Sequence, residues 1–180
     1  MTQTPAVSVV RLGHRPGRDE RTTTHVALVA RAFGADEAVL PAAASHVVET
    51  VDDIAARFGG EFAISTVDSP MGWLRRHDGP IVHLTMYGLP VQDLVDEINA
   101  DTSDGRLAVA VGAGKVPGEL YELADWNVAV TNQPHSEIAA LGVFFDRFTQ
   151  GDALEREWSD GPYQIHPSPD GKRVEPTEDR

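Results

Sequence analysis

Positively charged side chains are concentrated in one short segment near the N-terminus. The stretch VVRLGHRPGRDERTTTHVALVARAFGA, residues 9–35, contains five arginines and two of the seven histidines. Arg15, Arg18 and Arg21 fall on its polar loop or at the start of the helix that should follow. A guanidinium stays charged at physiological pH and donates hydrogen bonds from a planar fork that suits a phosphate. The segment is therefore a candidate phosphate-binding site. The alternative is that Arg21 forms a surface ion pair of small energetic consequence with Asp19, Glu20 or a helix neighbour.

Three further loops combine glycine, proline and small polar side chains. Residues 84–90 read LTMYGLP, residues 112–117 read GAGKVP, and residues 131–137 read TNQPHSE. The second loop fits neither the phosphate loop, which needs four residues between its glycines, nor the dinucleotide fingerprint, because residue 117 is proline. It can still present backbone amides to a small ligand. A tight turn with a solvated lysine, and a helix cap at Ser136, remain the alternative explanations.

The elements that must position these loops follow from the hydrophobic pattern. Short apolar runs alternate with amphipathic segments, which is typical of an α/β fold with a mostly parallel sheet and helices on both faces. In such sheets ligands bind on the loops that follow the carboxyl ends of strands, so the four loops should form one composite site. The pattern predicts a helix that begins after Thr22 or Thr23. The predicted strands are residues 7–11, 37–42, 61–67, 80–88, 107–112 and 126–131, and the other predicted helices are 46–60, 70–79, 94–101, 117–124 and 136–148.

Composition limits the class of protein. A chain of 180 residues fits one domain, here expected at residues 1–150. An acidic, proline-containing tail follows at 151–180, with a possible short helix at its start and the rest extended or disordered. Cysteine is absent and no long apolar run occurs, so we expect a cytoplasmic protein without disulfides or membrane spans. No His-x-x-x-His spacing occurs among the histidines, and no metal site is expected.

The balance of charges is unusual. There are 15 lysines and arginines against 28 acids, 15 − 28 = −13, and only two of the cations are lysine. An acidic excess with few lysines favours a protein that stays soluble in high salt, where screening removes self-repulsion. An ordinary acidic cytosolic protein is the alternative. The acidity does not exclude nucleic-acid binding, which depends on where the cations cluster.

Taken together, four segments resemble the archaeal tRNA (cytidine-56) 2′-O-methyltransferase family of SPOUT-class knotted methyltransferases. They are RLGHRPGRDERTTTHVALVARAFGAD, HLTMYGLP, VGAGKVP and NVAVTNQPHSEIAALGVFFDRF. The resemblance implies a C-terminal deep trefoil knot, a homodimer that completes the catalytic centre, and methylation of the ribose 2′-hydroxyl of cytidine 56 in the T-loop of tRNA. It also implies that S-adenosyl-L-methionine is held by Leu84, Gly112, Ala113, Gly114, Lys115, Val116, Val130, Thr131, Asn132, Gln133, Pro134, His135, Ser136 and Glu137.

In related knotted 2′-O-methyltransferases an arginine of the first motif is the usual catalytic candidate. Here the local pattern departs from the more widespread Asn-x-Gly form of that motif, so the arginines do not align uniquely. Our prediction is Arg21 first and Arg18 second, acting on the phosphate beside the target ribose or on the 2′-oxygen itself. Two other functions remain open: a nucleotide- or small-ligand-binding α/β protein, and a catalytically silent RNA-binding module of the same fold.

Overall fold

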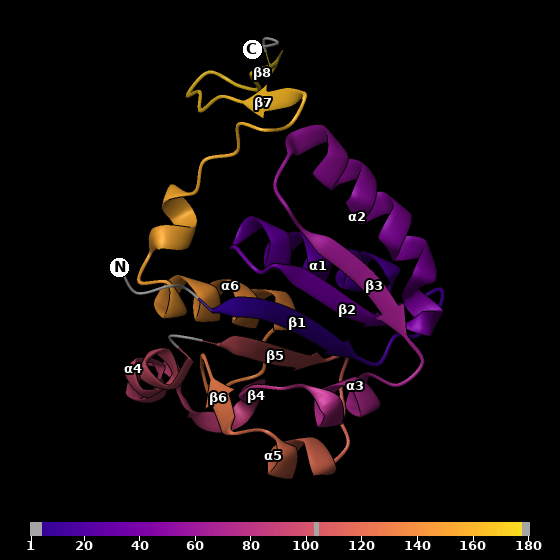
Figure 1. The fold of residues 1–180 in the computed structure, drawn as a ribbon, viewed down its shortest axis with the longest axis vertical. Coiled ribbons are helices and arrows are strands. Elements are labelled where there is room, and N and C mark those ends of the chain that lie inside the picture. Colours follow the sequence, from indigo (N-terminus) through magenta and orange to yellow (C-terminus); the bar gives the residue numbers. More distant parts are fainter. Residues whose placement is uncertain (1–4, 103–104, 178–180) are drawn as a thin grey trace.

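The centre of the molecule is a six-stranded sheet in the order β3-β2-β1-β5-β4-β6, with every strand pair parallel. The computed structural model describes residues 5–102 and 105–177, and Figure 1 shows the fold. The strands of the sheet are β1 (Ala6–Leu12), β2 (Glu37–Pro41), β3 (Ala63–Val67), β4 (Ile81–Pro90), β5 (Arg106–Gly112) and β6 (Trp126–Ala129). The helices are α1 (Glu20–Ala32), η1 (Ala42–Ala44), α2 (Ser45–Phe58), α3 (Pro70–Arg76), α4 (Val91–Thr102), α5 (Glu119–Leu123), α6 (Glu137–Phe148) and η2 (Asp152–Glu155).

Helices cover both faces of this sheet, which confirms the predicted fold class. Along β1, Val7 and Val9 belong to a core cluster with residues of α1, α4 and α6. Val10 and Leu12 point the other way, into a cluster with residues of α3 and α5. Successive side chains of a strand face opposite sides, so a continuous apolar strand needs a cover on each side. The strand order also reverses beside β1, where parallel α/β sheets bind their ligands.

Helix α1 begins earlier than the capping pattern predicts. It starts at Glu20 rather than after Thr22 or Thr23, and the side chain of Asp19, the residue before it, caps no helical amide. The Asp19 carboxylate instead accepts hydrogen bonds from the backbone and the guanidinium of Arg15. Thr23 is fully buried and faces His14. Thr23 therefore makes a tertiary contact, which local propensity does not report.

The tail is more ordered than its composition suggests. After η2, the strands β7 (Tyr163–Ile165) and β8 (Val174–Pro176) pair as an antiparallel hairpin, where the sequence reads as extended or disordered. Figure 1 shows the tail running from α6 along one side of the molecule to this hairpin beside α2. The Arg31 guanidinium stacks 4.5 Å from the ring centroid of Trp158, and the Asp160 carboxylate accepts a hydrogen bond from the Gly60 amide at 2.9 Å.

Substitution of Gly60 tests this packing of the tail. Gly60 has a φ of +87°, and a Cβ there would overlap the indole of Trp158. Gly151 is the matched control, with a φ of +90° and, among the described residues, no atom near its Cβ position. We expect Gly60→Ala to lower the free energy of unfolding by about 1–3 kcal/mol more than Gly151→Ala, the usual cost of overpacking. Denaturant unfolding at fixed salt measures both, and equal losses would contradict the packing.

Among the described residues, no helix is both long enough and apolar enough to cross a membrane.

Candidate active site

A cavity of about 730 Å³ opens where β4 and β5 end and α6 begins. Its size is within the range of small-molecule and cofactor sites. Eight of the residues predicted to bind the cofactor line it: Leu84, Gly112, Gly114, Lys115, Val116, Pro134, His135 and Glu137. Three of the four loops expected at this edge of the sheet therefore meet in one cavity, and the arginine-containing loop contributes no residue to its wall.

The other six predicted residues lie outside the cavity wall. Asn132 donates hydrogen bonds from Nδ2 to the carbonyl oxygens of Met86, at 2.7 Å, and Gly88, at 3.0 Å. It thereby ties the segment after β6 to the wall formed by β4. Ser136 caps α6 by accepting a hydrogen bond from the Ile138 amide. The set outside the wall is Ala113, Val130, Thr131, Asn132, Gln133 and Ser136.

Part of the wall was not predicted from the sequence. The Thr85 and Tyr121 hydroxyls lie 3.1 Å apart, and the ring of His83 meets that of Tyr121 edge-on at 4.8 Å. His83 Nδ1 also lies 2.8 Å from Asn127 Oδ1, and burial lowers the pKa of His83, which favours the neutral ring. The loop LTMYGLP indicated this region, and a helix was predicted at residues 117–124, but no local signal indicated that α5 contributes to the cavity wall. The additional wall residues are His83, Thr85, Met86, Tyr87, Gly118, Tyr121 and Ala140.

A buried arginine connects β1 to the cavity. Arg11 is 1% exposed, and its guanidinium donates a 2.7 Å hydrogen bond to Glu137 Oε1. Glu137 is the first residue of α6 and lines the cavity. Arg11 Nε has no hydrogen-bond partner among the described residues. Arg11 therefore holds Glu137 in place. Among the described residues, no other carboxylate pairs with Arg11.

The arginine loop (residues 13–19) starts beside the cavity loops. The Ala113 amide donates to the Leu12 carbonyl at 2.9 Å, and the Cβ position of Gly13 lies 3.6 Å from the Ala113 side chain. Neither Arg18 nor Arg21 lines the cavity, and both side chains are exposed. The structure therefore places the start of the arginine loop next to Ala113, outside the cavity wall, and leaves the two candidate catalytic arginines at the surface.

The three arginines differ in how they are paired. Arg15 binds Asp19 through two nitrogens at 3.0 Å, and this hydrogen bonding lowers the pKa of Asp19 to about 2. Within residues 5–102 and 105–177, no carboxylate pairs with Arg18 or Arg21. The surface ion pair considered for Arg21 is thus formed by Arg15 instead. Arg18 and Arg21 keep their donors available for an external anion.

Two solved methyltransferase structures share this fold. A crystal structure of an RNA 2′-O ribose methyltransferase matches 84% of the chain with a TM-score of 0.57 at 16% identity. The SpoU methyltransferase AviRb from Streptomyces viridochromogenes, in complex with the cofactor AdoMet, matches 83% with a TM-score of 0.53 at 16% identity. The chain spans 58% and 59% of the lengths of those two structures. At such identities the likeness defines the fold, that of the SpoU-type methyltransferases.

The family is shown by sequence. The family model described as tRNA ribose 2′-O-methyltransferase, aTrm56, matches residues 58–175. The tRNA (cytidine(56)-2′-O)-methyltransferase of Haloarcula marismortui is 53% identical over 174 residues, which are 97% of each chain. This chain belongs to the aTrm56 family of tRNA ribose 2′-O-methyltransferases, as the resemblance predicted. The matched region includes the two cavity loops after β5 and β6, and also the hairpin of the tail.

Proposed function

We propose that this protein transfers a methyl group from S-adenosyl-L-methionine to the ribose 2′-hydroxyl of cytidine 56 in the T-loop of tRNA. The observation that carries the proposal is the family match across residues 58–175, which contain every residue of the cavity wall. The relative from Haloarcula marismortui is named for this reaction on cytidine 56. The acidity of the chain supports an organism with high internal salt and a cytoplasmic location, where tRNA is found.

The cavity suits the proposed cofactor. A Cβ at Gly112 would overlap Val116, so this turn leaves no room for a side chain and keeps backbone close to the cavity. The hydroxyls of Thr85 and Tyr121 provide hydrogen-bonding groups beside the apolar side chains of Leu84 and Val116. When bound, the sulfonium supplies the electrophilic methyl group, so the transfer itself needs neither a metal nor a thiol. We assign all fourteen predicted residues to this site, with Asn132 and Ser136 acting through the loops they fix.

The protein's own task is to position the ribose and to ease loss of its proton. The 2′-oxygen must lie in line with the methyl carbon at near-attack distance. Arg18 and Arg21 are exposed guanidiniums without a carboxylate partner among the described residues, so each can bind the phosphate beside the ribose. Either can also stabilise the negative charge that grows on the 2′-oxygen as its proton leaves.

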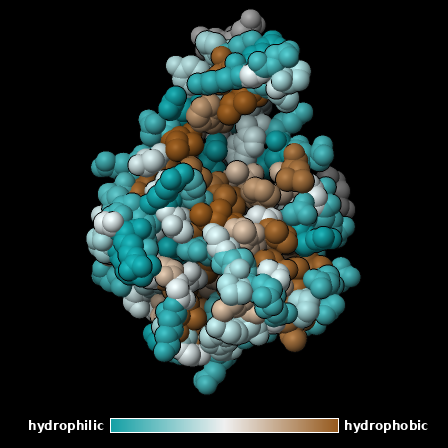
Figure 2. All heavy atoms as spheres, turned by 180° about the vertical axis from the view of Figure 1, so that it is seen from behind, coloured by the Kyte–Doolittle hydropathy of each residue, from teal (hydrophilic) through white to brown (hydrophobic). Residues whose placement is uncertain are grey.

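We further propose a homodimer and a trefoil knot, both implied by the family. Tyr87, which lines the cavity, is 74% exposed, and Leu89 next to it is 62% exposed. Figure 2 shows apolar side chains gathered through the middle of the opposite side of the molecule from Figure 1. A second copy would cover such surface and bring its own arginine loop to the cavity. Sedimentation equilibrium in molar potassium chloride tests the dimer, and a monomer of 19.5 kDa would contradict it.

Methyl transfer to defined tRNA tests the proposed function. Labelled S-adenosyl-L-methionine is incubated with unmodified tRNA transcript in molar potassium chloride, and the modified ribose is mapped. We expect label at cytidine 56 and none when that position carries 2′-deoxycytidine. Cofactor binding without transfer to any tRNA would favour the small-ligand-binding alternative. tRNA binding without transfer would favour the silent RNA-binding module.

Asn132 offers a test of how the cavity is held together. Asn132→Ala removes both hydrogen bonds that join the segment after β6 to the β4 wall. We expect cofactor affinity to fall by up to about 30-fold, since each of the two neutral hydrogen bonds contributes roughly 1 kcal/mol. Isothermal titration with S-adenosyl-L-methionine measures the loss. Gln133→Ala is the control from the same loop, and equal affinities of the two variants would contradict this role of Asn132.

A further inference from the structure

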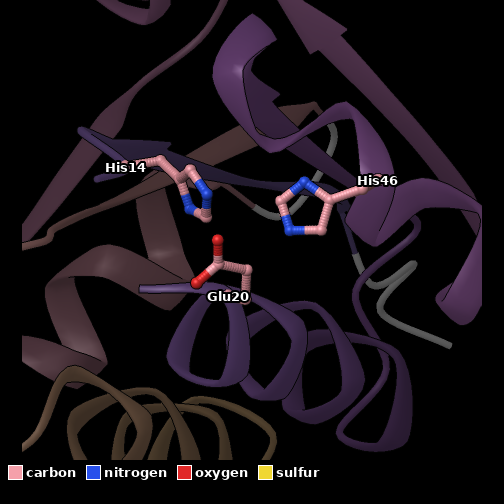
Figure 3. Close-up of side chains that lie close together, drawn as sticks. All are labelled: His14, Glu20 and His46. Carbon is pink, nitrogen blue, oxygen red and sulfur yellow. The ribbon is translucent and has the colours of Figure 1, made fainter. Parts of the chain in front are cut away.

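Two histidines and a glutamate from separate segments converge beside the arginine loop. His14 lies in that loop, Glu20 is the first residue of α1, and His46 is the second residue of α2. Their ligand atoms all lie within 4.8 Å of one another. Figure 3 shows the two imidazole rings and the Glu20 carboxylate turned toward a common space. The sequence indicated no metal site because His14 and His46 are 32 positions apart, and spacing rules detect only ligands on one local element.

The position and hydrogen bonding of His14 suit it to bind a metal ion. It is only 9% exposed, and its Nε2 has no hydrogen-bond partner among the described residues. Its other ring nitrogen, Nδ1, lies 2.7 Å from the Thr23 hydroxyl. A partner on one imidazole nitrogen fixes the ring and leaves the lone pair of the other free for a metal, which is the usual arrangement around metal-binding histidines. A buried polar atom without a partner is costly, and an ion in the cluster would satisfy it.

Charge in the cluster also suits a cation. Burial, together with the neighbouring His46, lowers the pKa of His14. The Gly17 backbone amide donates to Glu20 Oε1 and lowers the pKa of the carboxyl. Placement at the start of a helix explains an acidic residue at position 20. It does not explain why an unpartnered imidazole nitrogen and a second histidine lie next to it.

We propose that His14, Glu20 and His46 bind a divalent transition-metal ion, with zinc the best match to two imidazoles and one carboxylate. Three protein ligands with an open fourth position are a common zinc arrangement. Mg²⁺ prefers oxygen ligands, and this cluster offers oxygen from one carboxylate only. The ion would tie the loop that carries Arg18 to helix α2 and so limit its motion. This role is structural, is separate from methyl transfer, and does not depend on the proposed function.

The test is zinc binding by the full chain after removal of metals, in chelator-treated potassium chloride. We expect one Zn²⁺ per chain, and no displacement of it by millimolar Mg²⁺. His46→Ala changes an exposed ligand, and Glu20→Gln keeps an acceptor for the Gly17 amide. Each substitution should weaken zinc affinity by more than about 10-fold. Removal of an outer-shell partner of a metal site costs at least that much, and these two residues are proposed as direct ligands. His25→Ala, an exposed histidine of α1, is the matched control and should bind zinc like the unaltered chain.

Hydrogen exchange supplies a second measurement. Zinc should slow exchange of the backbone amides at residues 13–20 in the unaltered chain but not in His46→Ala. The absence of stoichiometric zinc binding, or equal affinity in His46→Ala, Glu20→Gln and His25→Ala, would overturn the site. Binding that depends on the cluster but leaves exchange of the loop unchanged would overturn the role assigned to the ion.

Discussion

Replacement of Arg21 by alanine should lower the rate of methyl transfer to tRNA by about 10²- to 10³-fold, the usual cost of removing a group that stabilises a developing oxyanion. Arg18→Ala should also depress turnover. Both side chains are exposed and have no carboxylate partner among the described residues, so neither substitution removes an interaction on which the fold depends. Affinity for S-adenosyl-L-methionine should stay nearly unchanged, because neither arginine lines the cavity.

Single-turnover kinetics with saturating tRNA, together with titration of the cofactor, separate these effects. Arg57→Ala is the matched control, since it removes an exposed guanidinium from α2, away from the arginine loop. Its rate should equal that of the unaltered chain. If Arg21→Ala and Arg18→Ala both retain full activity, the catalytic role of the loop is wrong. A rate that is restored by raised tRNA concentration would assign the arginines to phosphate binding rather than to the 2′-oxygen.

The second large effect is expected at the ion pair between the buried Arg11 of β1 and the partly exposed Glu137 of α6. Glu137→Ala should lower the free energy of unfolding by about 3–5 kcal/mol, because it leaves the guanidinium of Arg11 buried without its counter-ion. Arg11 is 1% exposed and Nε already lacks a partner among the described residues, so few groups remain to compensate. Denaturant unfolding monitored by fluorescence measures the loss. Affinity for the cofactor should fall as well, because Glu137 lines the cavity.

A double substitution distinguishes a lost ion pair from lost packing. Arg11→Met with Glu137→Leu removes both charges and retains apolar volume, and such replacements of buried pairs are often neutral. The double variant should therefore be more stable than Glu137→Ala alone. Glu119→Ala provides the control, since its pair with Arg75 is about half exposed and its loss should barely change stability. Equal effects of Glu137→Ala and Glu119→Ala would contradict the argument.

Local pattern was sufficient for the elements of the sheet. Continuous apolar runs such as residues 107–112 predicted buried parallel strands, and amphipathic runs such as residues 46–58 predicted helices. Because parallel strands end at the same edge, the same pattern also predicted that four loops meet in one site, and three of them line the cavity. The predicted cavity residues Leu84, Gly112 and Glu137 needed only this argument and the resemblance.

Other features depended on contacts between distant segments. Thr23 was read as a helix cap, but a histidine nine positions earlier engages it. Tyr121 completes the cavity wall from a helix whose own sequence shows only a short amphipathic turn. The tail was read as extended or disordered, but Trp158 and Asp160 contact Arg31 and Gly60 across a hundred residues or more. Periodicity describes which side of an element is apolar, and it does not report which partner that side will meet.

The sequence by itself determined the order of the elements, the family and the loops that make the site, because these depend on side-chain type and on short spacing. Only the tertiary structure determined which charged side chains pair with one another and which remain exposed. It assigned Arg15 to Asp19 and Arg11 to Glu137, left Arg18 and Arg21 exposed, and brought His14, Glu20 and His46 together. Charge interactions act over a few ångströms in space, whatever the separation along the chain. The partners of a charged residue are therefore fixed only when the strands and helices have packed.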